Sequence, residues 1–226
     1  MGGFGPLAGA HFYRRLIELT EADGDDRHLP VQLISDPDVP SRILHLRGEG
    51  PSPVAKLTDM ARRLQDAGVD LIVIPSATVH AYHAEIAASV EVPVLHLPQV
   101  AIRAVRDRGA ESVALLATTP TVRLGLYRTP ARVAGVELLI PDARSQNALM
   151  DVITDIKGGL EPEATARRLT EIATGPWAEG AQSLLLGCTD LPAVFPHTLR
   201  PQGTADATDE LAIAAILAAG GTPRAT

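Results

Sequence analysis

The sequence predicts an α/β fold built from two related halves, and three observations support this prediction. Short apolar runs bounded by turn residues alternate with helical patterns along the chain. The apolar residues in these runs are continuous rather than alternating, as in strands buried on both faces of a parallel sheet. A strand-to-turn segment also recurs, because GVDLIVIPSAT from Gly68 resembles GAQSLLLGCTD from Gly180, 112 positions later. We therefore expect two pseudo-symmetric domains, each a parallel sheet flanked by helices, with the active site in the cleft between them.

The first half is expected at residues 1–97 together with 207–226. It opens on a glycine turn at 2–6, and its helices and strands are expected, in order, at 8–20 (helix), 31–35 (strand), 54–67 (helix), 71–74 (strand), 92–95 (strand) and 209–219 (helix). The helix at 54–67 is indicated by apolar residues at helical spacing: Leu57, Met60, Ala61 and Leu64. No strand precedes the glycine turn, although an α/β half of this kind normally starts with one. The first half is therefore expected to lack its first strand.

The second half is expected at residues 98–206. Its predicted elements are a helix at 97–108, a strand at 113–116, a helix at 164–173 and a strand at 183–186. Ligands of parallel α/β sheets bind beyond the carboxyl ends of the strands. Ser76 and Cys188 occupy that position in their respective halves, so we expect them to face one another across a cleft.

Composition excludes several classes of protein. Of the 226 residues, 46% are hydrophobic, which is typical of a globular rather than a disordered chain. The longest apolar run, at 211–219, is far shorter than the roughly 20 residues of a membrane span, and no leader opens the chain, so a soluble, cytoplasmic protein is expected. A net charge of −7 and 3% aromatic residues disfavour nucleic acid as a partner. A single cysteine excludes an internal disulfide and a thiolate-rich metal site.

Cys188 is the strongest candidate for chemistry. It follows a buried strand in the segment LGCTDLP, and a helix beginning there would aim backbone N–H groups at the sulfur and lower the thiol pKa. A thiolate in that position can act as a base or a nucleophile. The alternative is a small buried hydrophobic residue without a chemical role.

Ser76 and His80 lie in the corresponding segment of the first half. The Ser76 hydroxyl can cap the next helix, or it can donate to a ligand. His80 lies one helical turn later, where it can bind a substrate carboxylate, polarise Ser76 or simply pack in the core. His83 adds a possible second metal ligand, but no third ligand has supporting spacing, so no metal is expected.

The glycine turn and Arg42 suggest where an anion binds. An exposed glycine turn before a helix is a good anion site, although Pro6 and the spacing argue against a dinucleotide loop. Arg42 follows the turn PDVPS, and its planar fork suits a carboxylate; the alternative is a solvated loop arginine.

Several motifs together resemble those of the aspartate/glutamate racemase family, over nearly the whole chain. The opening GGFGPLA resembles the family's GGMGPLA, and the segment from Asp36 to Arg42 resembles its (N/S)xPxxPDR loop. PSATVH, which contains Ser76, resembles the first catalytic motif PCNTAH. LLATTPT resembles LLATxGT, IKGG contains a lysine near the family's site, and GCTDLP resembles the second catalytic motif GCTELP.

The resemblance implies a cofactor-free isomerase, in which one cysteine thiolate removes the α-proton of an amino acid and a second thiol returns a proton to the opposite face. The implied substrate is a small acidic amino acid of the aspartate or glutamate type, and the implied assembly is a homodimer. Catalytic roles fall on Cys188 and Ser76. Substrate-binding roles fall on Gly5, Arg42, Thr78, His80, Thr118, Thr121, Lys157, Thr189 and Asp190.

The chain departs from the family pattern at the first catalytic motif. Ser76 replaces the cysteine and Ala77 replaces the asparagine, and a hydroxyl is too weak an acid to exist as its anion near neutral pH. Proton removal from the Ser76 side is therefore expected to be impaired. Two alternatives stay open: a decarboxylase of the arylmalonate type, which needs only the second cysteine, and a carboxylate-binding homologue without turnover.

Overall fold

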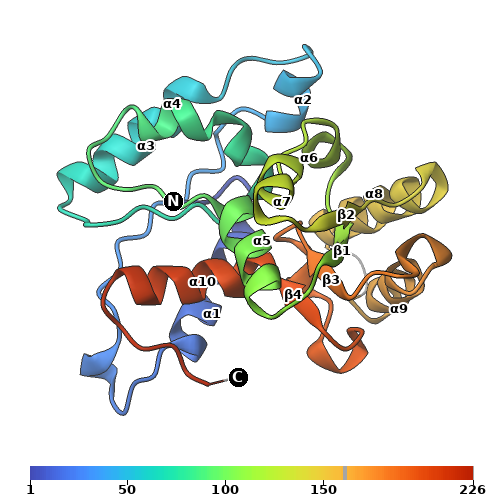
Figure 1. Cartoon of the computed structure of the whole chain (residues 1–226). Coiled ribbons are helices and arrows are strands. Elements are labelled where there is room, and N and C mark those ends of the chain that lie inside the picture. The colour runs from blue at the N-terminus through green and yellow to red at the C-terminus, as the bar shows by residue number, and fades with distance from the viewer. Residues whose placement is uncertain (160–161, 226) are drawn as a thin grey trace. The chain divides into compact units, whose positions relative to one another are not determined.

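The computed structural model describes residues 1–159 and 162–225. The backbone divides into two compact units, of which unit 1 contains Met1–Leu97 and Thr208–Thr226 and unit 2 contains Pro98–Ala207 (Figure 1). Both changes from one unit to the other occur at the beginning of a helix, α5 (Leu97–Asp107) and α10 (Ala207–Ala218). No helix in the described ranges has the length and apolar character needed to cross a bilayer.

Unit 2 contains a four-stranded parallel sheet. Its strands are β1 (Ser112–Leu116), β2 (Glu137–Leu139), β3 (Ser183–Leu186) and β4 (Thr204–Asp206), in the order β2-β1-β3-β4. The register pairs Leu116 with Leu186 and Leu186 with Asp206, so three strands end side by side. The strands expected at 113–116 and 183–186 are confirmed. The two outer strands were not predicted, because each has only three residues and includes a charged one, Glu137 in β2 and Asp206 in β4.

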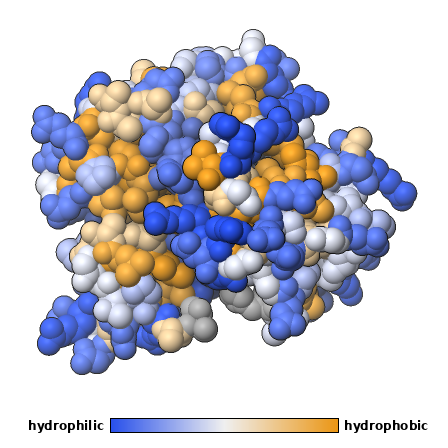
Figure 2. All heavy atoms as spheres, in the orientation of Figure 1, coloured by the Kyte–Doolittle hydropathy of each residue, from blue (hydrophilic) through white to orange (hydrophobic). Residues whose placement is uncertain are grey.

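Two long helices cover one face of this sheet. Helices α8 (Ala143–Lys157) and α9 (Pro162–Ala173) place Leu149, Val152 and Leu169 in a core with the alternate strand residues Leu116 and Leu186. Hydrophilic side chains cover the outer faces of both helices (Figure 2). The remaining helical segments of the unit are α6 (Thr119–Arg123), α7 (Arg128–Ala134), η3 (Pro176–Ala178), η4 (Leu191–Ala193) and η5 (His197–Leu199).

Unit 1 packs its helices on extended segments. The helical elements are α1 (Pro6–Leu19), η1 (Asp25–Arg27), α2 (Arg42–Leu46), α3 (Val54–Asp66), η2 (Ala77–Tyr82) and α4 (His83–Ala87). Helix α3 buries Leu57, Met60 and Leu64 in a core with Ile72 and Ile74, so the predicted apolar stripe is confirmed. The predicted helices at 8–20, 97–108, 164–173 and 209–219 are also present, with ends shifted by one or two residues.

The expected parallel strands of unit 1 are reduced to isolated bridges within the described residues. Gly2 pairs with Ser35 and Ile72 pairs with Val94, both in parallel. Ile72 N–H donates to Pro93 O and Leu95 N–H donates to Ile72 O, but Pro93 has no N–H with which to continue a ladder on its other side. The prediction of regular strands at 31–35, 71–74 and 92–95 is therefore wrong. Ile72 and Ile74 do lie buried in the core, whereas Val31 and Leu33 are exposed.

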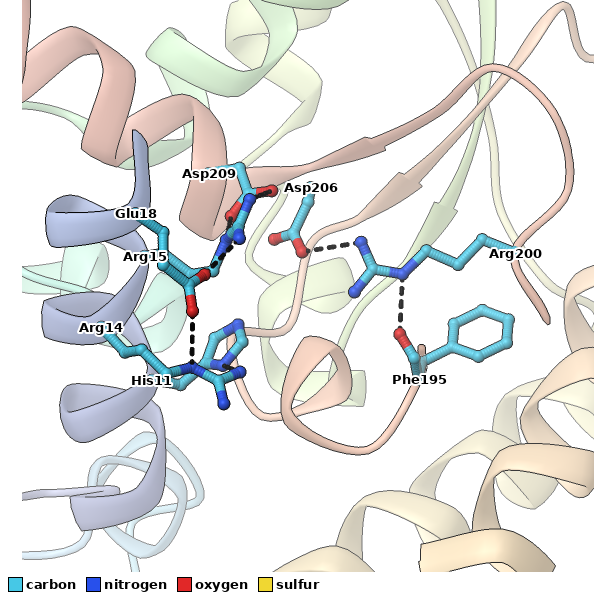
Figure 3. Close-up of polar contacts among 8 residues, drawn as sticks. All are labelled: His11, Arg14, Arg15, Glu18, Phe195, Arg200, Asp206 and Asp209. Carbon is cyan, nitrogen blue, oxygen red and sulfur yellow. Dashed lines mark hydrogen bonds and ion pairs between the residues drawn. The ribbon is translucent and has the colours of Figure 1, made fainter. Parts of the chain in front are cut away.

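An ion pair fixes the last helix of unit 1 to the first. Arg15 of α1 donates from Nε and Nη2 to the two carboxylate oxygens of Asp209 on α10, at 2.7 and 3.0 Å (Figure 3). This two-point contact is the geometry in which an arginine–carboxylate pair is strongest. The pair therefore attaches the C-terminal helix to unit 1 through a directional contact as well as through its apolar side chains.

Candidate active site

Cys188 lies directly beyond the carboxyl end of β3. The backbone N–H groups of Gly187 and Cys188 both donate to Leu116 O at the end of β1, at 2.8 and 3.1 Å, which holds the turn against the neighbouring strand. A Cβ on Gly187 would lie 2.5 Å from Leu115 Cδ1, so only glycine fits the turn without rearrangement. Tyr127, which is fully buried, donates from its hydroxyl to Gly187 O at 2.9 Å. The sulfur is therefore placed by a rigid, tightly packed strand end.

The thiol of Cys188 is buried, and this reverses one expectation. Burial raises the pKa of Cys188 to about 12, with a smaller contribution in the same direction from the Asp190 carboxylate. The expected lowering of the pKa by a helix is wrong, because the residues that follow form only the three-residue η4. Cys188 is thus held as a neutral thiol, whose Sγ donates to Asp190 Oδ2 at 3.8 Å.

Asp190 connects the sulfur to Lys157. Lys157 is the last residue of α8, and its Nζ lies 2.5 Å from Asp190 Oδ2, the same oxygen that faces the thiol. Asp190 is buried, whereas the Lys157 side chain is 44% exposed. The ammonium group of Lys157 is therefore paired with Asp190 and is not a free cation beside the sulfur.

Three buried threonines lie in the segments that follow β1 and β3. Thr118 caps α6, because its hydroxyl accepts from Thr121 N–H at 3.4 Å and lies 2.9 Å from Thr121 Oγ1. Thr189 follows Cys188 directly and is also buried. Sequence reasoning selected all three from the motifs. It missed Gln146, which donates from Nε2 to Ala117 O at 3.0 Å and anchors the β1 end to α8.

A buried ion pair closes the segment that carries Cys188. Arg200 donates from Nε to Phe195 O at 2.8 Å, and its Nη1 lies 3.1 Å from Asp206 Oδ2 at the end of β4 (Figure 3). Both charged side chains are almost completely buried. Because Asp206 pairs with Leu186 in the sheet, this contact ties residue 195 back to the strand from which the segment leaves. Neither residue has a motif or spacing that marks it in the sequence.

In unit 1, Ser76 occupies the end of the extended segment at 72–74. It is half-buried and precedes η2, but its side chain makes no capping hydrogen bond, so capping does not account for it. Thr78 lies in η2 and is half-buried as well. The helix expected to follow Ser76 is a six-residue 3₁₀ segment before α4, so no long helix aims its dipole at the hydroxyl.

His80 supports the backbone of Ser76 rather than its hydroxyl. Its Nδ1 lies 2.9 Å from Ser76 O, and its Nε2 accepts from Leu97 N–H at 3.0 Å. Burial lowers the pKa of His80 to about 3, so the ring is neutral, donating from Nδ1 and accepting at Nε2. Both ring nitrogens have backbone partners, and a role of His80 in binding a substrate carboxylate stays a prediction. The rings of His83 and His96 pack against the His80 ring, with centroid distances of 5.7 and 5.1 Å.

Arg42 is built into the glycine turn. Its guanidinium donates to Phe4 O and to Pro40 O, and it lies over the Phe4 ring at 5.2 Å from the centroid. Gly5 precedes α1 as its N-cap. Gly3 has a φ of +98°, and a Cβ there would lie 2.1 Å from Asp36 N, so the turn requires glycine at that point. The predicted partners Gly5 and Arg42 thus lie in one local structure.

Each unit therefore gathers its own set of predicted residues. Unit 2 brings Cys188, Asp190 and Lys157 into direct contact, with Thr118, Thr121 and Thr189 in the adjoining turns. Unit 1 holds Gly5 and Arg42 at the glycine turn and Ser76, Thr78 and His80 after the 72–74 segment; Met1 N donates to Val73 O at 3.0 Å, so these two parts adjoin. That Ser76 faces Cys188 stays a prediction.

Several known proteins with similar sequences or structures are described as racemases. The chain is 26% identical over 203 residues to the broad specificity amino-acid racemase RacX of Bacillus subtilis, covering 87% of this chain and 86% of the relative. Aspartate racemase from Picrophilus torridus superposes with a TM-score of 0.89 at 27% identity, covering 99% of this chain and 94% of that one. A putative Asp/Glu racemase from Yersinia pestis shares the fold, with a TM-score of 0.80, 23% identity and 96% of both chains covered.

The family model described as Asp/Glu/Hydantoin racemase matches residues 1–215. This match covers nearly the whole chain, including Ser76 and Cys188. Racemases are isomerases. The chain accordingly belongs to the Asp/Glu/hydantoin racemase family, a family of isomerases.

Proposed function

We propose that this protein is a cofactor-independent amino-acid isomerase in which Cys188 is the main acid/base at the α-carbon. The contact of the Cys188 thiol with Asp190 carries the proposal. A thiol whose pKa is raised to about 12 is a proton donor at rest, and a carboxylate 3.8 Å away is placed to receive its proton when the sulfur must act as a base. The rigid turn around Gly187 keeps the sulfur at one place while the proton moves.

Ser76 is the proposed partner on the opposite face of the substrate carbon. Its hydroxyl makes no capping bond, and His80 fixes its backbone. A serine hydroxyl delivers a proton to a carbanion far more readily than it removes one, because its anion is scarce at neutral pH. We therefore expect unequal rates from the two faces: exchange of the α-proton on the Cys188 face is fast, and inversion of the α-carbon is slow.

The reaction is tested by incubating the protein with L-amino acids in heavy water and following the α-proton by NMR and the product by chiral chromatography. Exchange with inversion supports a racemase, and exchange with retention supports an enzyme that works from one face. Cys188→Ala is expected to abolish exchange. Exchange at the wild-type rate in that variant would overturn the assignment.

A lyase is the second candidate, and the buried thiol favours it. A decarboxylase needs one proton donor, which protonates the enediolate left when carbon dioxide departs, and Cys188 is the one cysteine of the chain. Release of carbon dioxide from a panel of α-substituted malonates, lost in Cys188→Ala, would support this reaction. Exchange of amino-acid α-protons with no turnover of malonates supports the isomerase.

The proposed mechanism requires two domains, at 1–97 with 207–226 and at 98–206, and a cleft where Ser76 faces Cys188. In Ser76→Cys, a short bis-alkylating reagent should link the two thiols within one molecule, as measured by mass spectrometry. Failure to link them, with both thiols singly modified, would contradict the arrangement.

We further propose that the protein is a cytoplasmic homodimer. Light scattering on the purified protein measures its mass in solution and so tests the dimer.

The substrate class is a separate question. The family resemblance favours a small acidic amino acid, held by Arg42 and Lys157.

A further inference from the structure

The peptide unit that joins Gly187 to Cys188 is held on both of its edges. Its N–H, which belongs to Cys188, donates to Leu116 O at the end of β1 at 3.1 Å. Its carbonyl, which belongs to Gly187, accepts from the hydroxyl of Tyr127 at 2.9 Å. Because the N–H and the C=O point to opposite sides of a planar unit, the two hydrogen bonds together prevent the plane from rotating. The direction in which the Cys188 side chain leaves the backbone is fixed as a result.

Glycine at position 187 makes this restraint necessary. A Cβ there would lie 3.2 Å from Cε2 and Cζ of the Tyr127 ring and 2.5 Å from Leu115 Cδ1, so the packing of this turn requires that the Cβ be absent. The same absence removes the steric barrier that limits backbone rotation at other residues. The hydrogen bond from Tyr127 therefore supplies the order that a glycine backbone lacks.

The hydroxyl of Tyr127 serves this carbonyl and not the packing of the core. Tyr127 is 1% exposed, and the ring of a phenylalanine would fill nearly the same volume. A buried hydroxyl needs a hydrogen-bond partner to offset the loss of water, and Gly187 O is that partner. Burial raises the pKa of Tyr127 well above its usual value of 10, with smaller contributions from Cys188 and Asp206. The phenol thus keeps its proton, and the donor is present, throughout the neutral range.

The backbone that carries Tyr127 is itself fixed on both sides. Leu126 N–H donates to Thr121 O at 3.2 Å, which ties the tyrosine to the turn after β1. Ala131 N–H donates to Tyr127 O at 2.9 Å, which ties it to α7. Tyr127 therefore transmits the arrangement of the turn after β1 to the turn after β3, where Cys188 lies.

We propose that Tyr127 is a positioning residue for proton transfer, and that it acts through the Gly187 carbonyl to hold the Cys188 sulfur in one orientation. The inference rests on the proposed function, because it concerns the same sulfur, and it adds a residue that no motif of the sequence marks. A sulfur in a second orientation leaves the rest of the site unchanged but lies in the wrong place for the α-proton. The loss of Tyr127's hydroxyl should accordingly lower kcat and change KM much less.

The kinetic test compares Tyr127→Phe with a matched control. In Tyr127→Phe, kcat for α-proton exchange should fall at least about tenfold, since a misplacement of about 1 Å costs on the order of 10²-fold. Thr20→Val removes another buried hydroxyl that donates to a backbone carbonyl, Leu16 O in unit 1, and should leave kcat and KM unchanged.

The orientation of the sulfur also has a readout that needs no activity. The chain contains one cysteine, so labelling with cysteine enriched in ¹³C at Cβ gives a single NMR signal from Cys188. One sharp resonance is expected in the wild-type protein and in Thr20→Val. Tyr127→Phe should show a second resonance or exchange broadening, which a loss of stability alone does not produce in the folded protein.

A rescue variant carries p-aminophenylalanine at position 127. Its N–H is a weaker donor than a phenol, so kcat and the shape of the resonance should lie between those of Tyr127→Phe and the wild type. This variant replaces Tyr127→Phe in the test if the latter does not fold. Wild-type kcat and one sharp resonance in the variant that is then tested would overturn the inference.

The outcomes separate the inference from the proposed function. One sharp, unshifted Cys188 resonance in Tyr127→Phe overturns the inference and leaves the isomerase in place. If no amino acid exchanges its α-proton in the wild-type protein, the proposed function fails instead. The resonances then still decide whether the Tyr127 hydroxyl fixes the orientation of Cys188.

Discussion

The Cys188 thiol lies in a buried strand end and faces a carboxylate, and this environment determines its chemistry. The position of Cys188 could be predicted, because the recurring strand-to-turn segment marks the end of a parallel strand. The direction of its pKa shift could not. Burial depends on how α8, α9 and the strands close around the sulfur, and no local pattern near residue 188 reports it.

The raised pKa of Cys188 predicts slow alkylation at neutral pH. The rate of reaction with iodoacetamide should be far below that of a free cysteine thiol at pH 7–9 and should climb steeply toward pH 12, since the thiolate is the nucleophile. Mass spectrometry over this range measures it. Asp190→Asn removes one cause of the high pKa and should shift the profile to lower pH; a shift to higher pH would contradict the assignment.

Replacing Ser76 by cysteine is expected to increase racemisation. Ser76→Cys, preferably with Ala77→Asn, supplies a second thiol and should raise two-way racemisation by at least about tenfold, because a thiol is a far stronger acid than a hydroxyl. Chiral chromatography from both enantiomers measures it. Ala77→Asn alone is the control and should leave the rate of inversion low. If Ser76→Cys lowers turnover of the true substrate, the serine belongs to a different reaction and the lyase gains support.

At the scale of elements, the central strands and the long helices could be predicted from the sequence. The short outer strands of unit 2 and the extended segments of unit 1 could not. The apolar residues at 113–116 and 184–186 are buried, as continuous apolar runs predict. β4 escaped prediction because TAD is polar and short, yet it supplies Asp206 to the buried ion pair. In unit 1, proline lacks the backbone N–H needed to extend the hydrogen-bond ladder between strands, and the apolar content of a segment does not reveal this effect.

The tight packing of the turn after β3 predicts that adding one methyl group at Gly187 destabilises the fold. Gly187→Ala places a Cβ 2.5 Å from Leu115 Cδ1 and 3.2 Å from the Tyr127 ring, and should lower the free energy of unfolding by about 1–3 kcal/mol through overpacking. Thermal and chemical denaturation measure it. Gly158→Ala, with φ of −79° and ordinary contacts at 3.5 Å, is the matched control and should be nearly neutral. Equal effects of the two changes would show that the packing around Gly187 is not tight.

At the scale of the whole molecule, two buried groups predict a stability that falls on both sides of neutral pH. The pKa of His80 is lowered from 6.5 to about 3, so its contribution is present above pH 6.5 and is lost as pH falls toward 3. The pKa of Cys188 is raised from 9.0 to about 12, so its contribution is present below pH 9 and is lost as pH rises toward 12.

Urea denaturation from pH 3 to pH 11 measures this profile. His80→Gln should flatten the acid side and leave the alkaline side unchanged, and Cys188→Ala should do the opposite. Each group should account for a loss on the order of a few kcal/mol. An acid limb that is equally steep in His80→Gln would assign the loss to other groups.

The two changes of unit occur at the first residues of α5 and α10, with Leu97 beginning one helix and β4 leading into the other without an intervening loop. Proteases cut exposed, extended chain, and neither boundary provides it. Limited digestion should therefore nick surface loops inside a unit before it separates the two. Unit 2 expressed alone would begin one residue inside a helix and end at the first residue of another, so the dissection that suits domains joined by a linker does not suit this chain.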